Sequence, residues 1–168
     1  MLGPPFERIR VGPARMEDLD RILAILGEAA GWLRARGLDQ WPLEMPGRIV
    51  LPGLTAGNCH LAWDDGVAVG TLTLQDADET FWGERPPDAF YLHRLAVSRS
   101  HRGLGRELLE WAEAATRSAG RSFLRLDCMS DNPGLRAFYE RAGYLHRGDV
   151  DGWGTSLYER EVGGPRRR

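Results

Sequence analysis

The stretch Arg102-Gly103-Leu104-Gly105-Arg106 separates a strand-like run, residues 91–97, from a helix-like run, residues 107–119. Glycine lets backbone amides approach a ligand that a Cβ atom would keep away. The N–H groups and the positive dipole end of the following helix favour an anion at this place. Arg102 and Arg106 add charge that can pair with a diphosphate. The stretch therefore predicts a phosphate-binding turn between a strand and a helix.

The composition of the 168 residues is typical of one globular domain, with 42% hydrophobic and 27% charged residues. We expect a single domain over residues 1–168, with flexible tails at 1–7 and 163–168. The net charge of −2 gives no reason to expect a nucleic-acid partner. No apolar run is long enough to cross a bilayer, and prolines interrupt the start of the chain, where a signal peptide would need an apolar segment. We therefore predict a cytoplasmic protein that binds neither membrane nor nucleic acid.

Lysine is absent, so all 22 cationic side chains are arginines. A phosphate-loop nucleotidase needs the lysine of its GK[ST] motif, and a pyridoxal enzyme needs a lysine for its Schiff base. Both classes are excluded. Cys59 and Cys128 lie far apart without a CxxC spacing, so we expect no metal site and no disulfide framework.

Hydrophobic periodicity divides the chain into alternating strands and helices. We predict strands at 8–11, 60–63, 67–75, 89–97, 122–128, 144–147 and 154–161, and helices at 16–36, 107–119 and 135–142. Residues 38–59 have no sustained period, which indicates a short helix or a loop over a ligand site. This order predicts a mixed α/β (α+β) fold and not a regular doubly wound sheet.

Local signals support several of these boundaries. Asp64-Asp65-Gly66 predicts a hairpin turn between two strands. Asn132 is expected to cap the third helix, with Pro133 at its first position. In the second helix, Glu113 is expected to face water opposite the apolar stripe.

Two segments together resemble the GNAT superfamily of N-acetyltransferases. The first is Leu95-Ala96-Val97-Ser98-Arg99-Ser100-His101-Arg102-Gly103-Leu104-Gly105, which looks like the acetyl-CoA loop [QR]xxGx[GA] of that family. The second is Asp131-Asn132-Pro133-Gly134-Leu135-Arg136-Ala137-Phe138-Tyr139-Glu140-Arg141-Ala142-Gly143-Tyr144, which looks like its asparagine and tyrosine helix. The resemblance implies a mostly antiparallel central sheet of six to seven strands with helices on both faces.

The resemblance implies acetyl-CoA as co-substrate. Leu95, Ala96 and Val97 would pair their backbone groups with the pantetheine, and the amides from Arg102 through Gly103, Leu104 and Gly105 to Arg106 would hold the diphosphate. Asn132 would lie near the pantetheine. The chain departs from the family at the first loop position, where Ser100 replaces Gln or Arg, and Arg99 or Arg102 would supply the missing contact.

The chemistry implied is acyl transfer to an amine. Tyr139 matches the usual general acid of the family and would protonate the departing CoA sulfur, while a backbone N–H near Leu95 would polarise the thioester carbonyl. His93 alternates with Tyr91 and Leu95 along its strand, so its imidazole is a candidate base. Asp127, Glu79 and a chain of waters are alternatives for the base, and a packed histidine is the structural alternative.

Trp41 and Trp82 lie in irregular segments that by resemblance border the acceptor. With Tyr91 and Asp127 they are the candidate substrate-binding residues, because an aromatic wall suits an apolar or cationic molecule. The alternative is that these tryptophans hold loops against the core.

These features predict an N-acetyltransferase that acts on a primary amine of a small molecule or peptide by direct transfer in a ternary complex. A covalent route through Cys128 is a second mechanism. A non-catalytic acyl-CoA-binding or protein-interaction module on the same fold is the alternative function. The chain is expected to be a monomer or a homodimer.

Overall fold

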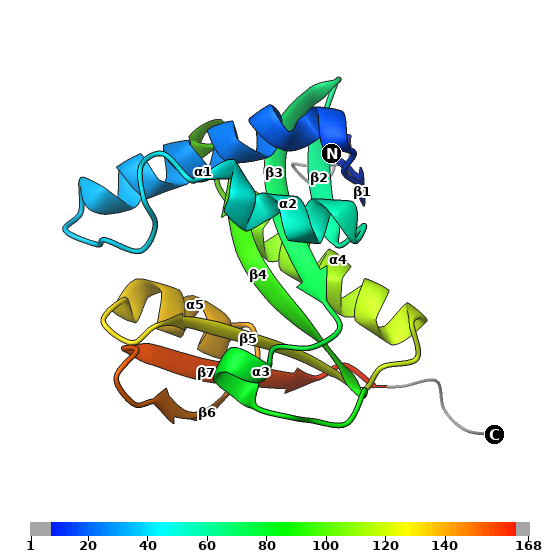
Figure 1. Ribbon diagram of the computed structural model, residues 1–168, viewed down its shortest axis with the longest axis vertical. Helices are drawn as coiled ribbons and strands as arrows, with labels where there is room; N and C mark the ends of the chain where they lie inside the picture. Colours follow the sequence, from blue (N-terminus) through cyan, green and yellow to red (C-terminus); the bar gives the residue numbers. More distant parts are fainter. Residues whose placement is uncertain (1–7, 164–168) are drawn as a thin grey trace, which may run out of the picture. The chain divides into compact units, whose positions relative to one another are not determined.

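The computed structural model describes residues 8–163, so the predicted tails at 1–7 and 163–168 lie, except for residue 163, outside the described residues. The elements follow in chain order, and Figure 1 labels the helices α1–α5 and the strands β1–β7 among them. They are β1 (Arg10–Pro13), η1 (Met16–Asp18), α1 (Leu19–Arg34), α2 (Gly47–Thr55), β2 (Cys59–Asp64), β3 (Val67–Gln75), α3 (Glu79–Trp82), β4 (Ala89–Val97), η2 (Arg99–His101), α4 (Leu104–Ser118), β5 (Phe123–Met129), α5 (Pro133–Arg141), β6 (Leu145–Val150) and β7 (Thr155–Glu161).

The seven strands form a mixed sheet in the order β1-β2-β3-β4-β5-β7-β6. β1 pairs with β2, β2 with β3, β5 with β7 and β6 with β7, all antiparallel, whereas β4 and β5 run parallel. The prediction of a mixed, mostly antiparallel sheet is confirmed. None of the helices in residues 8–163 combines the length and the apolar character that a bilayer crossing needs.

The described chain forms two compact units. The first contains residues 8–73 and 94–109, and the second contains residues 74–93 and 110–163. β3, β4 and α4 each contribute residues to both units. The prediction of one domain over residues 1–168 stays a prediction.

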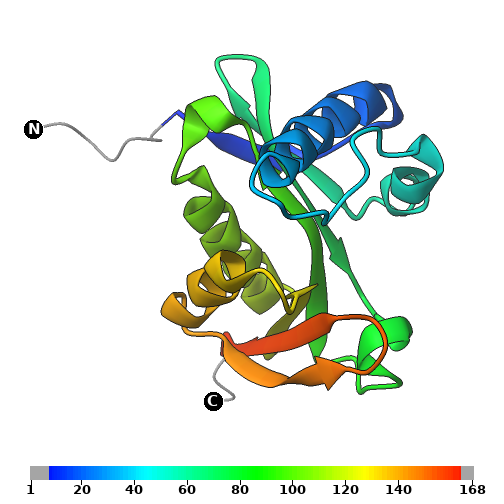
Figure 2. The same cartoon turned by 90° about the vertical axis from the view of Figure 1, so that its left-hand side faces the viewer.

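The first unit has helices on both faces of its strands. A Cβ atom on Gly53 of α2 would lie 3.3 Å from Thr73 of β3, and a Cβ atom on Gly70 of β3 would lie 2.8 Å from Leu108 of α4. Gly70 and Thr73 are three positions apart in regular pairing, so they face opposite sides of the strand. α2 and α4 therefore cover opposite faces, as Figure 2 shows. The core between α1, α2 and β2 includes Leu26, Val50 and Leu61, all almost fully buried.

The second unit is organised around a buried arginine. Arg125 of β5 is 4% exposed; it donates from Nε to Glu159 at 2.7 Å and from Nη1 to Asp88 at 3.0 Å. Its guanidinium carbon lies 5.5 Å from the centre of the Trp82 ring. An arrangement of the strands that separated Arg125 from its carboxylate partners would leave an unpaired charge in the core. These pairs therefore favour the observed arrangement of the strands.

Several boundaries differ from the sequence-based expectations. The first strand begins two residues later than expected, and the helix predicted over 16–36 begins with the 3-10 turn η1, where Asp18 accepts a hydrogen bond from the Arg15 amide at 2.8 Å. Residues 38–59 contain α2, and α3 was not predicted. The expectation that Glu113 faces water is wrong: it is 6% exposed and accepts hydrogen bonds from Tyr144 and Arg160.

Candidate active site

The glycine turn has the geometry that its sequence predicts. Gly103 has φ of 94°, a conformation that side chains with a Cβ rarely adopt, and α4 begins at the next residue. A Cβ atom at Gly105 would have nothing within 4 Å, so the space beside this residue is open. The amide of Arg106 donates to the Gly103 carbonyl at 3.1 Å and is therefore already used. The backbone amides of Leu104 and Gly105 are the better candidates to bind an anion. The side chain of Leu104 is buried in the core.

The residues before the turn are anchored to the first unit. His101 Nε2 lies 2.9 Å from Asp64 Oδ2, and its Nδ1 lies 2.8 Å from the Ser100 hydroxyl. The backbone amide of Ser98 donates to the Val69 carbonyl at 2.8 Å. Ser100, the position where the family has Gln or Arg, therefore holds His101 in place. These contacts give the turn a fixed orientation.

β4 contains one residue with an unusual backbone. Arg94 has φ of 50°, which is uncommon for a residue with a Cβ atom and interrupts the extended strand. Because the strand is interrupted between them, simple alternation no longer places the side chains of His93 and Leu95 on the same face of β4. The sequence had predicted that they share a face. Ala96 is 6% exposed and belongs to the core of the first unit, whereas Leu95 and Val97 are half-buried. Nothing in the sequence signals this conformation of Arg94.

Asn132 and Tyr139 belong to α5 and its cap in the second unit. The Asn132 side chain accepts a hydrogen bond from the Leu135 amide at 3.0 Å, so the predicted N-cap is confirmed. Tyr139 is 5% exposed and packs edge-on against Tyr144, with ring centres 5.8 Å apart. Burial, together with the nearby Cys128 and Asp127, raises the pKa of Tyr139. Its hydroxyl is therefore protonated at neutral pH, as a general acid requires.

Cys128 is buried, with 5% exposure. Burial, and next the negative charge of Asp127, raise the pKa of this thiol to about 12. A thiolate is the nucleophilic form of cysteine, so this environment disfavours a covalent acetyl intermediate on Cys128. Cys59 is fully buried as well.

His93 lies between two carboxylates of the second unit. Its Nε2 is 3.4 Å from Asp78 Oδ2, and its Nδ1 is 3.7 Å from Asp127 Oδ1. Ligand atoms of the three side chains all lie within 4.8 Å of one another. The structure thus brings together two residues that the sequence singled out and adds Asp78. Such a set can attract an ammonium group or a metal cation.

Asp78 is placed by the short helix α3. It is the N-cap residue of this helix, and its Oδ1 accepts a hydrogen bond from the Phe81 amide at 3.3 Å. Its side chain is 7% exposed. An aspartate before Glu79-Thr80-Phe81-Trp82 is a recognisable helix-cap signal, which could have revealed both the helix and the residue. Glu79, the other candidate base, is exposed.

The candidate substrate-binding aromatic residues lie mostly in the two cores. Trp82 and Tyr91 are 5% and 2% exposed, and the Tyr91 hydroxyl accepts a hydrogen bond from Arg125 at 3.0 Å. Trp41 is partly buried against the core of the first unit. This placement favours the structural alternative for the two tryptophans and a structural role for Tyr91. Asp127, with 20% of its side chain exposed, is the accessible member of the predicted set.

Comparisons with known proteins give one consistent result. Residues 24–144 match the acetyltransferase (GNAT) family, which is well over half of the chain. The chain is 35% identical over 160 residues to the uncharacterized N-acetyltransferase YesJ of Bacillus subtilis (strain 168), covering 89% of this chain and 88% of that protein.

Solved structures agree on the fold. A GNAT-family acetyltransferase from Listeria monocytogenes 4b F2365 superposes with a TM-score of 0.78 at 26% identity, covering 91% of this chain and 94% of that one. The protein yncA from Salmonella typhimurium, solved with its cofactor acetyl-CoA, superposes with a TM-score of 0.68 at 17% identity, covering 95% of this chain and 97% of that one. The second likeness, at this identity, is evidence for the fold alone.

Proposed function

The chain belongs to the GNAT family of acetyltransferases, and from this premise we propose that it transfers the acetyl group of acetyl-CoA directly to a primary amine of a small molecule or peptide. That it is an acetyl-CoA-dependent N-acetyltransferase follows from the family and from its N-acetyltransferase relative. The direct transfer, the acceptor class and the residue roles are the proposal. A cytoplasmic location, the lack of a resident metal and a monomeric or homodimeric state are also expectations.

The proposal gives the first unit the task of binding the cofactor. The amides of Leu104 and Gly105 bind the diphosphate, since they lie at the N-terminus of α4 and the space beside Gly105 is open. The backbone of residues 95–97 pairs with the pantetheine. A backbone N–H near Leu95 donates to the thioester carbonyl as negative charge develops on its oxygen.

The second unit supplies the proton transfers. The acceptor must lose a proton before its nitrogen can attack, and His93 accepts that proton while Asp78 and Asp127 stabilise the resulting positive charge. The nitrogen forms its bond to the acetyl carbon as the carbon–sulfur bond breaks. Tyr139, protonated in its buried position, gives its proton to the departing sulfur, and the second proton that the nitrogen loses as it becomes an amide restores the Tyr139 hydroxyl. The products are an N-acetylated amine and CoA with a free thiol.

The single observation that carries the acceptor class is the position of His93 between two carboxylates. Two anionic groups favour an acceptor that arrives as a cation, which is the state of most primary amines at neutral pH. The raised pKa of Cys128 supports direct transfer over a covalent route.

The test measures acetyl-CoA binding by calorimetry and then the release of free thiol with a panel of amines. We expect binding, and thiol release with at least one cationic primary amine. A matched panel of neutral hydroxyl compounds of similar size should give none. Binding without thiol release from any amine would instead support the non-catalytic module.

A further inference from the structure

A stack of three side chains lies on the first unit beside the glycine turn. The guanidinium carbons of Arg36 and Arg99 each lie 3.9 Å from the centre of the Trp32 ring. Two guanidinium groups this close to one ring centre must occupy its opposite faces. Trp32 belongs to the last turn of α1, Arg36 lies two residues beyond the end of this helix, and Arg99 lies four residues before Gly103.

The stack carries more positive charge than the protein neutralises. Arg102 and Arg36 both act on Arg99, and with burial as the largest cause they lower its pKa. Within residues 8–163, neither the two stacked arginines, Arg36 and Arg99, nor the neighbouring Arg102 forms an ion pair with a carboxylate. Glu28 is the one acidic group whose charge reaches Arg99, and its Oε1 accepts the Arg99 backbone amide at 2.9 Å. Three cations and one anion leave a net charge of about +2.

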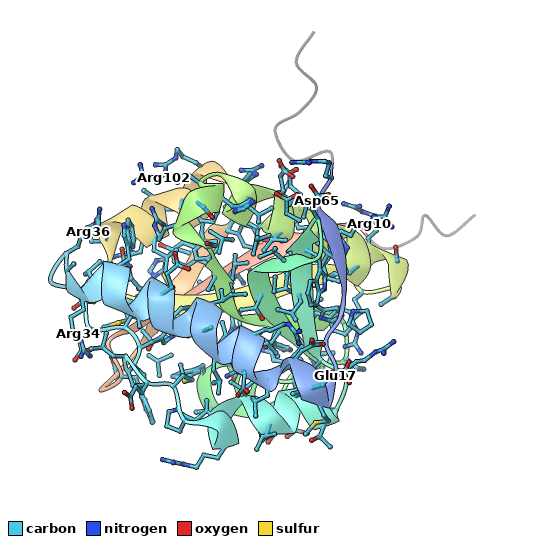
Figure 3. All side chains as sticks on the ribbon, turned by 90° about the horizontal axis from the view of Figure 1, so that it is seen from above. Arg10, Glu17, Arg34, Arg36, Asp65 and Arg102 are labelled. Atoms are coloured by element: carbon cyan, nitrogen blue, oxygen red, sulfur yellow. The ribbon has the colours of Figure 1, made fainter. Side chains whose placement is uncertain are left out.

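Stacking leaves the polar edges of the guanidinium groups available. A guanidinium group packs its flat face on an aromatic ring and carries its N–H donors in the perpendicular plane. Arg36 uses one donor, Nη1, for the Trp32 carbonyl at 3.1 Å, and the buried Nε of Arg99 has no partner among the described residues. Figure 3 shows Arg36 at the end of α1 and Arg102 on the same side of the view. The geometry is that of an anion-binding surface.

We propose that Arg36, held on Trp32 together with Arg99, binds the 3′-phosphate of the adenosine moiety of acetyl-CoA. This rests on the proposed use of the glycine turn, and it adds a second phosphate subsite to that turn. In the cofactor, the diphosphate joins the pantetheine to an adenosine whose ribose carries the third phosphate. With the diphosphate bound at residues 102–105, Arg99 and Arg102, which precede Gly103, would be the cations nearest in sequence to this third phosphate. A dianionic phosphate also matches the uncompensated charge of the cluster.

The test compares the binding of CoA and of dephospho-CoA, which lacks the 3′-phosphate, by calorimetry at fixed ionic strength. We expect the protein to prefer CoA about tenfold, the effect of one charge-assisted pair. Arg36→Ala should reduce this preference to less than twofold while the Kd for dephospho-CoA stays within twofold. Arg36→Lys should recover part of the preference, because it keeps the charge and loses the planar donors.

Arg34→Ala is the matched control. Arg34 is the last residue of α1, two positions before Arg36, and pairs with Asp39 at 2.5 Å, so its removal should leave the preference intact. Equal affinity of the wild-type protein for CoA and dephospho-CoA would overturn the subsite, as would an equal loss of both affinities in Arg36→Ala. Failure of the proposed function has a different signature, because acetyl-dephospho-CoA should still support thiol release with an amine when only the subsite is wrong.

Discussion

The hydroxyl of Tyr139 is the group on which the proposed chemistry depends most directly. We predict that Tyr139→Phe lowers kcat by about 10²- to 10⁴-fold, the usual contribution of a positioned general acid. The Kd for acetyl-CoA should change less than twofold, since the phenyl ring keeps the contacts with Phe138 and Tyr144. Steady-state kinetics and calorimetry measure the two quantities.

Tyr144→Phe is the control for that experiment. It removes the same atom from another buried tyrosine of the second unit, whose hydroxyl donates to Glu113 at 3.1 Å. This variant should unfold at lower temperature yet keep its kcat. An unchanged kcat in Tyr139→Phe would remove Tyr139 from the mechanism.

The cluster of Asp78, His93 and Asp127 leads to a prediction about metal removal. Its three side chains have the ligand types of a divalent cation site. Since we assign the cluster to proton transfer, the enzyme dialysed against excess EDTA should keep its full kcat. Thiol release before and after dialysis measures this. Activity that disappears with EDTA and returns with added Zn²⁺ would assign the cluster to a metal instead.

At the scale of residues, the sequence identified individual candidate catalytic side chains better than it identified which side chains lie next to them. An imidazole on a strand and a tyrosine in a capped helix can be recognised one at a time from residue type and spacing. The approach of Asp78 and Asp127 to His93 depends on parallel pairing between β4 and β5 and on the short helix α3. Contacts between distant segments are not encoded in local patterns, so the helix-cap signal could reveal Asp78 but not its approach to His93.

At the scale of elements, the start of α4 carries the cofactor-binding prediction. Gly105→Leu should raise the Kd for acetyl-CoA at least about 100-fold, because the side chain would fill the space that the diphosphate needs. The melting temperature should not fall, since no protein atom lies within 4 Å of the new Cβ and leucine favours a helix by about 1 kcal/mol over glycine. Calorimetry and thermal unfolding give the two values. Wild-type affinity in this variant would place the diphosphate elsewhere.

The contact between β3 and α4 in the first unit gives a stability prediction. A Cβ atom at Gly70 would meet Leu108 at 2.8 Å, so Gly70→Ala forces the leucine to move. We expect a loss of about 1–3 kcal/mol in the free energy of unfolding, the usual cost of overpacking. Urea titration measures it.

Gly12→Ala on β1 is the matched control for that substitution, because its Cβ has nothing within 4 Å. This variant should be at least as stable as the wild-type protein. If Gly70→Ala were equally stable, close packing of α4 on β3 would not be needed.

Elements were predictable where pattern and propensity agree. The bounds of β3 and β4 match the prediction, because β-branched and aromatic runs end at clear turn signals. α2 was left open, since Gly47, Pro52 and Gly53 are poor helix formers. Its buried residues Val50 and Leu54 show that packing against the core stabilises it despite its composition.

At the scale of the whole molecule, the strand order was not contained in local periodicity. β7 pairs with β5 and leaves β6 at the edge of the sheet, a choice made by long-range pairing. Only the resemblance carried by two motifs predicted a sheet of this kind. A short motif can therefore specify more of the architecture than the periodicity of all the strands together.

The buried acids of the second unit predict a loss of stability in alkali. The pKa values of Cys128, Tyr139 and Tyr144 are all raised, chiefly by burial. In the unfolded chain these groups lose their protons above about pH 8.5 for the thiol and pH 10 for the phenols. The folded protein still holds the protons there, so the unfolded state is favoured and stability falls as pH rises.

We expect the free energy of unfolding to fall from about pH 9 upward, with a slope of at most ~1.4 kcal/mol per pH unit for each such group. Urea titrations between pH 7 and 11 measure it. Cys128→Ala should remove the part of the stability loss that begins at the lowest pH, near pH 9. This part arises because the thiol loses its proton above about pH 8.5 in the unfolded chain, whereas its pKa in the folded protein is about 12. Tyr139→Phe should leave that part in place and reduce the loss above pH 10. A free energy of unfolding that stays constant to pH 11 would mean that these groups are exposed to water in solution. Burial would then no longer explain a protonated Tyr139 hydroxyl or an inert Cys128 thiol.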